Sequence, residues 1–184
     1  MSVNVATPQG IGVGSWKIDP VHSHVGFAVK HMGVSTFRGR FEDYEAKLYA
    51  DDGSAPRLEG AVRTASVVVK DDNLAGHLAS PDFFDTERYP EIRFVSTEVR
   101  TGERGELEID GELTIKGHTH PVTGRGEISG PVDVGGAEKL GVELDAVIDR
   151  RDYGLGFNME LPGGGLAVAN EVKLEVSLEL VREA

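Results

Sequence analysis

Residues 106–116 read ELEIDGELTIK, and apolar and polar side chains alternate through most of this stretch. The apolar members are Leu107, Ile109, Leu113 and Ile115. A period of two is the period of a β-strand that buries one face and exposes the other. Strands of parallel sheets are buried on both faces and are apolar throughout, so this stretch predicts an antiparallel sheet.

The same alternation returns along the chain. It is clear in residues 140–149 (LGVELDAVID) and 172–180 (VKLEVSLEL). Noisier strand patterns cover residues 24–30, 35–50, 58–69 and 91–100. Within 35–50 the apolar positions change parity after Phe41, which predicts a bulge or bend near Asp43. These patterns indicate an all-β fold of about eight long antiparallel strands, and we favour a barrel over a sandwich.

Length and charge limit the possible functions. The chain has 184 residues, which fits one domain, and 31 acidic against 19 basic residues give a net charge of −12. An acidic surface disfavours nucleic acid as a partner. With no cysteine, the chain has neither disulfides nor thiol chemistry.

We predict a flexible tail over residues 1–13 and one domain over 14–184. The start of the chain lacks the features of a secretory signal, and no apolar run is long enough for stable membrane insertion, so we expect a cytoplasmic protein.

Two stretches interrupt the strand pattern. Residues 71–86 predict one or two short helices that close one end of the barrel, because Ser80 and Pro81 are typical of a helix start. Residues 149–165 contain a triple glycine and predict a long loop, and loops of this length are often functional.

Histidines offer the main alternative to a binding function. His22 and His24 are two residues apart, as are His118 and His120, so each pair shares one face of a strand. Imidazoles at this spacing can bind zinc, which leaves a metal-dependent enzyme or metal-binding protein at the barrel rim as the second hypothesis. Neither a carboxylate nor a cysteine completes a ligand set in the sequence, and the common catalytic motifs do not occur, so we expect no metal, no cofactor and no enzyme activity.

Four motifs in order resemble those of the YceI-like family of polyisoprenoid-binding proteins. The motifs are Trp16-Lys17-Ile18-Asp19 with Val21-His22-Ser23 and Lys30-His31, His77-Leu78 with Ser80-Pro81-Asp82-Phe83-Phe84-Asp85, Tyr89-Pro90, and Gly111-Glu112-Leu113-Thr114-Ile115-Lys116-Gly117 with Pro121-Val122. The resemblance covers about residues 15–181. It implies an eight-stranded antiparallel lipocalin-like β-barrel whose elongated cavity holds an isoprenoid chain, such as a quinone tail, and it implies a possible homodimer.

This resemblance selects between two interpretations of the apolar inward face. From the residues alone, a barrel of this size can be filled by its own side chains and bind nothing. The resemblance favours a hollow barrel that binds a long-chain polyisoprenoid for transport, storage or sequestration. The predicted lipid contacts are Val25, Phe27, Val29, Phe37, Phe41, Leu78, Phe83, Phe84, Phe94, Leu113, Ile115, Leu144, Phe157, Leu174 and Val176. The motif histidines His22, His31 and His77 are predicted to form a polar mouth.

Overall fold

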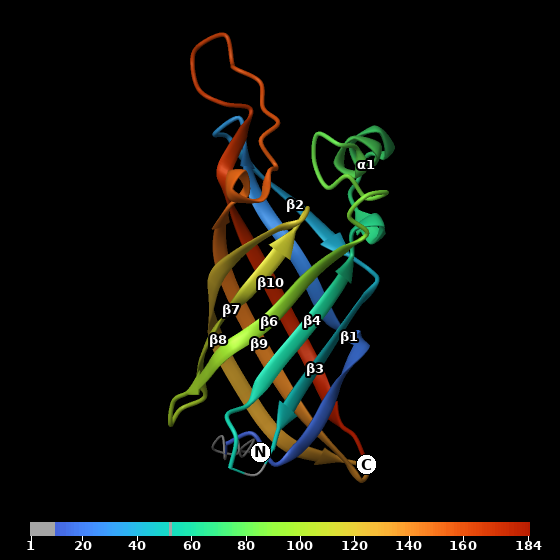
Figure 1. The fold of residues 1–184 in the computed structure, drawn as a ribbon, viewed down its shortest axis with the longest axis vertical. Coiled ribbons are helices and arrows are strands. Elements are labelled where there is room, and N and C mark those ends of the chain that lie inside the picture. The colour runs from blue at the N-terminus through green and yellow to red at the C-terminus, as the bar shows by residue number, and fades with distance from the viewer. Residues whose placement is uncertain (1–9, 52) are drawn as a thin grey trace, which may run out of the picture.

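The computed structural model describes residues 10–51 and 53–184. Within these residues the chain forms one α-helix, two short 3-10 helices and a single sheet (Figure 1). The helices are α1 (Asp72–Ala79), η1 (Thr64–Ser66) and η2 (Arg150–Tyr153). The strands are β1 (Gly14–His31), β2 (Ser35–Phe41), β3 (Tyr44–Ala50), β4 (Arg57–Arg63), β5 (Val67–Val68), β6 (Glu91–Thr101), β7 (Glu106–Ile115), β8 (His118–Val134), β9 (Ala137–Asp149) and β10 (Val168–Arg182).

Antiparallel pairing closes the sheet into a barrel. The strand order is β10-β9-β8-β7-β6-β4-β3-β1-β2-β5, and β1 also pairs with β10. Both β2 and β3 pair with β1, so they are the two halves of one bent strand, and β4 and β5 flank those halves in the same way. The predicted eight-stranded antiparallel barrel is therefore confirmed, although two of its strands are broken. Among the described residues, no helix is long and apolar enough to cross a membrane.

The break between β2 and β3 lies at the predicted bend near Asp43. The amide of Asp43 donates to the Ser66 hydroxyl at 3.0 Å, and the amide of Glu42 donates to the Ser66 carbonyl at 3.3 Å. Backbone groups that leave the ladder at the bend thus find partners in η1, although the bend lies at the surface.

Side chains on the inner face follow the alternation that the sequence shows. In β7, Leu107, Ile109, Leu113 and Ile115 are all buried, while the charged residues between them are half-buried or exposed. The antiparallel register then carries the inner face from strand to strand, since directly paired residues share a face.

The barrel is solid at the end where the chain terminates. Trp16 and Leu180 are completely buried there and pack with Leu48, Leu107 and Leu140 in one apolar cluster. Residues before β1 join this end. The Trp16 indole N–H donates to the carbonyl of Gly12, and Ile11 packs against the cluster. Of the predicted tail, residues 1–9 lie outside the described residues.

At the opposite end lie α1 and the segment between η2 and β10 (Figure 1). The Asp71 carboxylate caps α1 by accepting a hydrogen bond from the amide of Leu74 at 2.8 Å. A second helix does not start at Ser80. Its hydroxyl donates instead to the carbonyl of His77, at 2.6 Å, and turns follow from Pro81 to Phe84.

Candidate functional site

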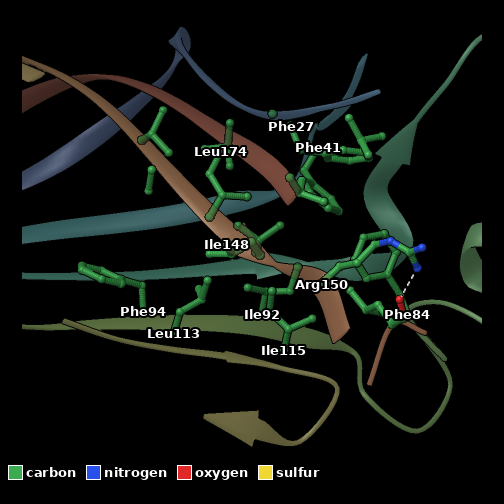
Figure 2. Close-up of a pocket in the computed structure, with 18 of the residues that line it drawn as sticks. Phe27, Phe41, Phe84, Ile92, Phe94, Leu113, Ile115, Ile148, Arg150 and Leu174 are labelled. Atoms are coloured by element: carbon green, nitrogen blue, oxygen red, sulfur yellow. Dashed lines mark hydrogen bonds between the residues drawn. The ribbon is translucent and has the colours of Figure 1, made fainter. Parts of the chain in front are cut away.

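The end of the barrel beneath α1 is hollow. A cavity of about 770 Å³ lies there, bounded by the inner faces of the strands, by α1 and by the segment before β10 (Figure 2). This volume falls within the usual range of small-molecule pockets. Exposed residues such as His31, Ser35 and Met159 belong to the lining, so the cavity reaches the molecular surface at this end.

Burial distinguishes the hollow half from the solid half. Phe27, Phe94 and Leu174 point inward yet remain only half-buried, whereas Trp16 and Leu180 in the solid half are inaccessible. Inward side chains that fill a core lose all exposure, so the partial exposure of this set reflects empty space next to it. The sequence pattern is the same in both halves and does not show this difference.

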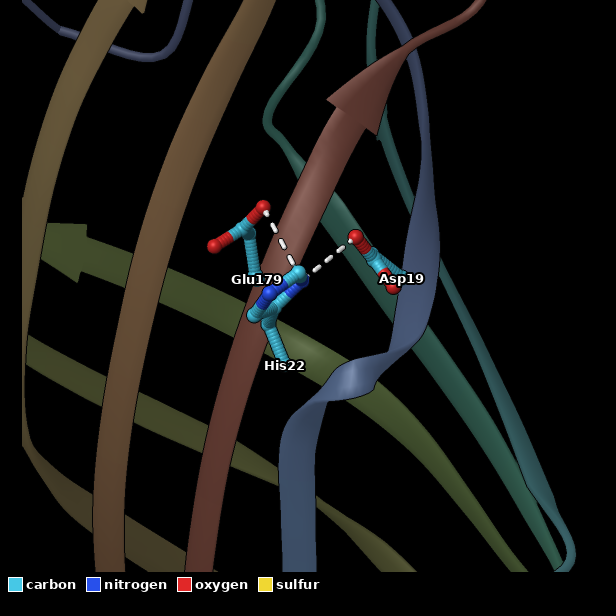
Figure 3. A group of neighbouring side chains, drawn as sticks. All are labelled: Asp19, His22 and Glu179. Carbon is cyan, nitrogen blue, oxygen red and sulfur yellow. Dashed lines mark hydrogen bonds and ion pairs between the residues drawn. The ribbon is translucent and has the colours of Figure 1, made fainter.

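Every apolar side chain predicted to contact a lipid lines this cavity. Of the predicted polar mouth, His31 and His77 also belong to the lining. The structure does not place His22 there, because it lies in an irregular part of β1 on the outer surface (Figure 3).

Four phenylalanines form an aromatic cluster in the wall. The Phe27 ring centroid lies 6.2 Å from that of Phe37, 5.9 Å from Phe41 and 6.4 Å from Phe84. Phe41 and Phe84 meet edge to face at 5.7 Å. These spacings suit tilted aromatic packing, which gives this part of the wall a fixed shape.

A second aromatic group lies where α1 meets the segment before β10. The His77 ring packs edge-on against Phe83 at 4.9 Å and against Phe157 at 4.7 Å. Its Nε2 atom lies 3.1 Å from a carboxylate oxygen of Asp82. His77 thus combines an apolar contact with the cavity wall and a polar contact with solvent-exposed Asp82.

Arg150 is a charged residue of the cavity lining that the sequence analysis did not predict. It opens η2, directly after β9, and its side chain is buried in the cavity wall beside Phe84 (Figure 2). Its Nε donates to the carbonyl of Ala169 at 2.9 Å, and Nη1 donates to the carbonyls of Leu155 and Phe157. Burial lowers the pKa of the guanidinium. The sequence does contain one indication that Arg150 points inward, because position 150 continues the alternation of the inward residues 140, 142, 144, 146 and 148.

The carboxylate next to Arg150 is already engaged. Asp149 accepts hydrogen bonds from Arg151 Nη2 at 2.6 Å and Nε at 3.0 Å. These bonds, with that from the Arg151 amide, lower the pKa of Asp149 to about 2. Asp149 and Arg151 therefore form a local pair on the outer surface.

A separate group of titratable side chains surrounds His22 (Figure 3). His22 Nδ1 lies 2.9 Å from Asp19 Oδ2 and 3.9 Å from Glu179 Oε1. The hydrogen bond to Asp19 raises the pKa of His22 and lowers that of Asp19. Lys139 Nζ contacts the same Glu179 oxygen at 2.5 Å, so a protein cation already balances this carboxylate.

His118 and His120 lie at the rim, outside the cavity lining. The His120 ring packs edge-on against Tyr153 of η2 at 5.2 Å. A Cβ atom on Gly154 would lie 3.0 Å from His118 Nε2, which shows how closely η2 covers this pair.

A closed antiparallel barrel with an apolar cavity open at one end defines the lipocalin-like class of β-barrels. The YceI-like domain model matches residues 16–180, and the chain therefore belongs to the YceI-like family. Among curated proteins, it is similar to a UPF0312 protein of Staphylococcus aureus strain MSSA476, with 33% identity over 171 residues that cover 90% of this chain and 96% of the relative.

Solved structures share the fold. BcnA of Burkholderia cenocepacia matches with a TM-score of 0.72 and 24% identity, over 90% of this chain and 99% of that one. A domain of Saccharophagus degradans, described as a polyisoprenoid binding domain implicated in plant cell wall breakdown, matches with a TM-score of 0.68 and 13% identity, over 94% of this chain and all of that one. At these identities the likeness shows the fold alone.

Proposed function

We propose that this protein binds one long-chain polyisoprenoid, or a related apolar lipid, in the cavity and transports, stores or sequesters it without chemical turnover. The observation that carries this proposal is the hollow end of the barrel. Its cavity of about 770 Å³ is lined mainly by aliphatic and aromatic side chains, many of which remain half-buried. A lipid chain would remove these side chains from water as a solid core does.

The energetics support an apolar ligand. Each CH₂ group that leaves water contributes about 0.8 kcal/mol, so a few isoprene units offset the cost of ordering the ligand. Specificity would come mostly from the width and length of the cavity, since few polar groups converge on it.

Relatives of the same fold support the ligand class. The Saccharophagus degradans domain is described as polyisoprenoid-binding, and its match covers 94% of this chain. The proposal includes an isoprenoid quinone or its precursor as a candidate ligand. It also includes a cytoplasmic location and a possible homodimer.

Organic extraction of the purified protein, with mass spectrometry against a blank, tests the proposal. We expect an isoprenoid or related lipid at about one molecule per chain, and its mass identifies the chain length. An empty extract, together with no thermal shift on addition of quinones or of prenyl acids of several tail lengths, would overturn the proposal.

A further inference from the structure

Arg150 places a buried positive charge in the wall of a mainly apolar cavity. The residue is 3% exposed, and it lies beside Phe84, far from Phe94 in the deeper part of the lining (Figure 2). Arginine stays protonated throughout the physiological pH range, so it cannot escape the cost of burial by losing its proton.

The contacts of Arg150 leave its charge without an anion. Its hydrogen bonds go to backbone carbonyls only: those of Leu155, Phe157 and Ala169, and that of Val168 at 3.3 Å from Nη2. Within residues 10–51 and 53–184, no carboxylate lies within ion-pair distance of this guanidinium. The neighbouring carboxylate, Asp149, pairs with Arg151 instead.

One donor also remains for a ligand. A guanidinium has five N–H groups. Four of them make the bonds above, two from Nη1 and one each from Nε and Nη2, which leaves one N–H on Nη2 without a partner in the described part of the chain. Because charge-assisted hydrogen bonds are the strong ones, an anionic oxygen suits this position better than a neutral one.

We propose that Arg150 binds the anionic head group, a carboxylate or a phosphate, of the lipid in the cavity. This inference rests on the proposed function and narrows it: the ligand is an acidic amphiphile, with its apolar chain among the phenylalanines and its head at Arg150. A prenyl phosphate and a prenyl or fatty acid share the required chemistry.

The competing explanation is that Arg150 only braces the segment before β10. The hydrogen bonds that its guanidinium donates go to backbone carbonyls within residues 155–169, and they would hold that segment without any ligand. A brace affects all ligands alike, whereas a head-group site discriminates between ligands that share a chain. The ratio of affinities therefore separates the two explanations.

The first test uses the unmodified protein and three ligands with the same prenyl chain: geranylgeraniol, geranylgeranoic acid and geranylgeranyl phosphate. Competition against a fluorescent lipid probe gives their relative affinities. We expect at least one of the two anions to bind about tenfold more tightly than the alcohol. The tighter anion identifies the head group. An alcohol that binds as tightly as both anions would overturn the proposal.

The second test compares Arg150→Gln with Arg151→Gln, its exposed neighbour in η2. We expect Arg150→Gln to bring the ratio of anion affinity to alcohol affinity close to one. Arg151→Gln should keep the ratio of the unmodified protein, and Arg150→Lys should restore part of it. Equal weakening of all three ligands in Arg150→Gln would assign Arg150 to the brace. If Arg150→Gln does not fold, equal affinities of the alcohol and both anions in the unmodified protein would still overturn the proposal, and Arg150→Lys takes its place in the comparison.

The two proposals fail in different ways. Binding of all three ligands with equal affinity overturns the role of Arg150 and leaves lipid binding standing. Failure of all three ligands to bind, with an empty organic extract, overturns lipid binding and the role of Arg150 with it.

Discussion

The ring of Phe27 lies over Gly39, its partner across β1 and β2. A Cβ atom on Gly39 would lie 2.5 Å from Phe27 Cζ, closer than such atoms approach in proteins. The absent side chain at position 39 therefore provides the space that lets the Phe27 ring lie against the wall. This pair helps to set the width of the cavity.

Replacing Gly39 tests that relationship. We expect Gly39→Ala to push the Phe27 ring into the cavity, weaken lipid binding several-fold and lower the free energy of unfolding by about 1 kcal/mol, the lower end for overpacking. Gly60→Ala is the matched control, since its Cβ has 3.7 Å to the nearest atom in the same cavity wall. Lipid titration and urea unfolding measure both effects. Equal behaviour of the two variants would contradict this account of the wall.

Ser23 joins the irregular part of β1 to β10. Its hydroxyl donates to the carbonyl of Asp19 at 2.7 Å and accepts from the amide of Glu179 at 3.0 Å, where the register between β1 and β10 shifts. We expect Ser23→Ala to lower the free energy of unfolding by about 1–2 kcal/mol, because the Glu179 amide loses its partner. Denaturant unfolding provides the measurement.

Ser177→Ala is the control for this prediction. Ser177 lies on β10, and its hydroxyl bonds an exposed carboxylate, Glu143. We expect a change within about 0.5 kcal/mol, as for most surface substitutions. A cost as large as that of Ser23→Ala would mean that loss of a serine hydroxyl on this sheet, and not the junction, causes the effect.

The His22 and Asp19 pair predicts a specific pH dependence. Asp19 raises the pKa of His22, so the folded state holds this proton more strongly than the unfolded state. The stabilisation is fully present below the unfolded pKa of about 6.5, and it is lost as the pH rises through the higher folded value. An NMR titration of the imidazole should show a midpoint above about 6.5.

A pair of variants isolates the cause of this shift. Asp19→Asn removes the main hydrogen-bonding carboxylate, and we expect the midpoint of His22 to fall toward its ordinary value. Asp145→Asn removes a carboxylate that pairs with Lys173 and should leave the midpoint in place. An unchanged midpoint in Asp19→Asn would show that Asp19 does not hold the proton.

The sequence allowed most of the barrel to be predicted, because the period-two alternation in strands such as β7 specifies both the strand and its inner face. The residue pattern alone did not predict the hollow end, which only the family resemblance implied, since Leu174 in the cavity wall and Leu180 in the solid core occupy the same kind of position in that pattern. His22 was assigned to the mouth from its motif, and the register shift in β1 between Asp19 and His24 explains its place outside.

Arg150 was not predicted as a site residue for a different reason. It continues the inward parity of β9, but it lies in a stretch whose glycines predict a loop, and loop residues are expected at the surface. Only the structure shows that η2 turns this arginine back into the cavity wall.

The central claim is that a lipid binds inside the barrel, and narrowing the cavity from within one strand tests it most directly. Ala146 lines the cavity, and its neighbour Val147 lies on the outer face with 59% exposure. Native mass spectrometry with geranylgeraniol and geranylgeranoic acid, titrated separately, should show one bound lipid in the unmodified protein and in Val147→Phe. Ala146→Phe should lose that complex while it keeps the same circular dichroism spectrum. Equal lipid binding in both variants, or none in the unmodified protein, would contradict a lipid site inside the barrel.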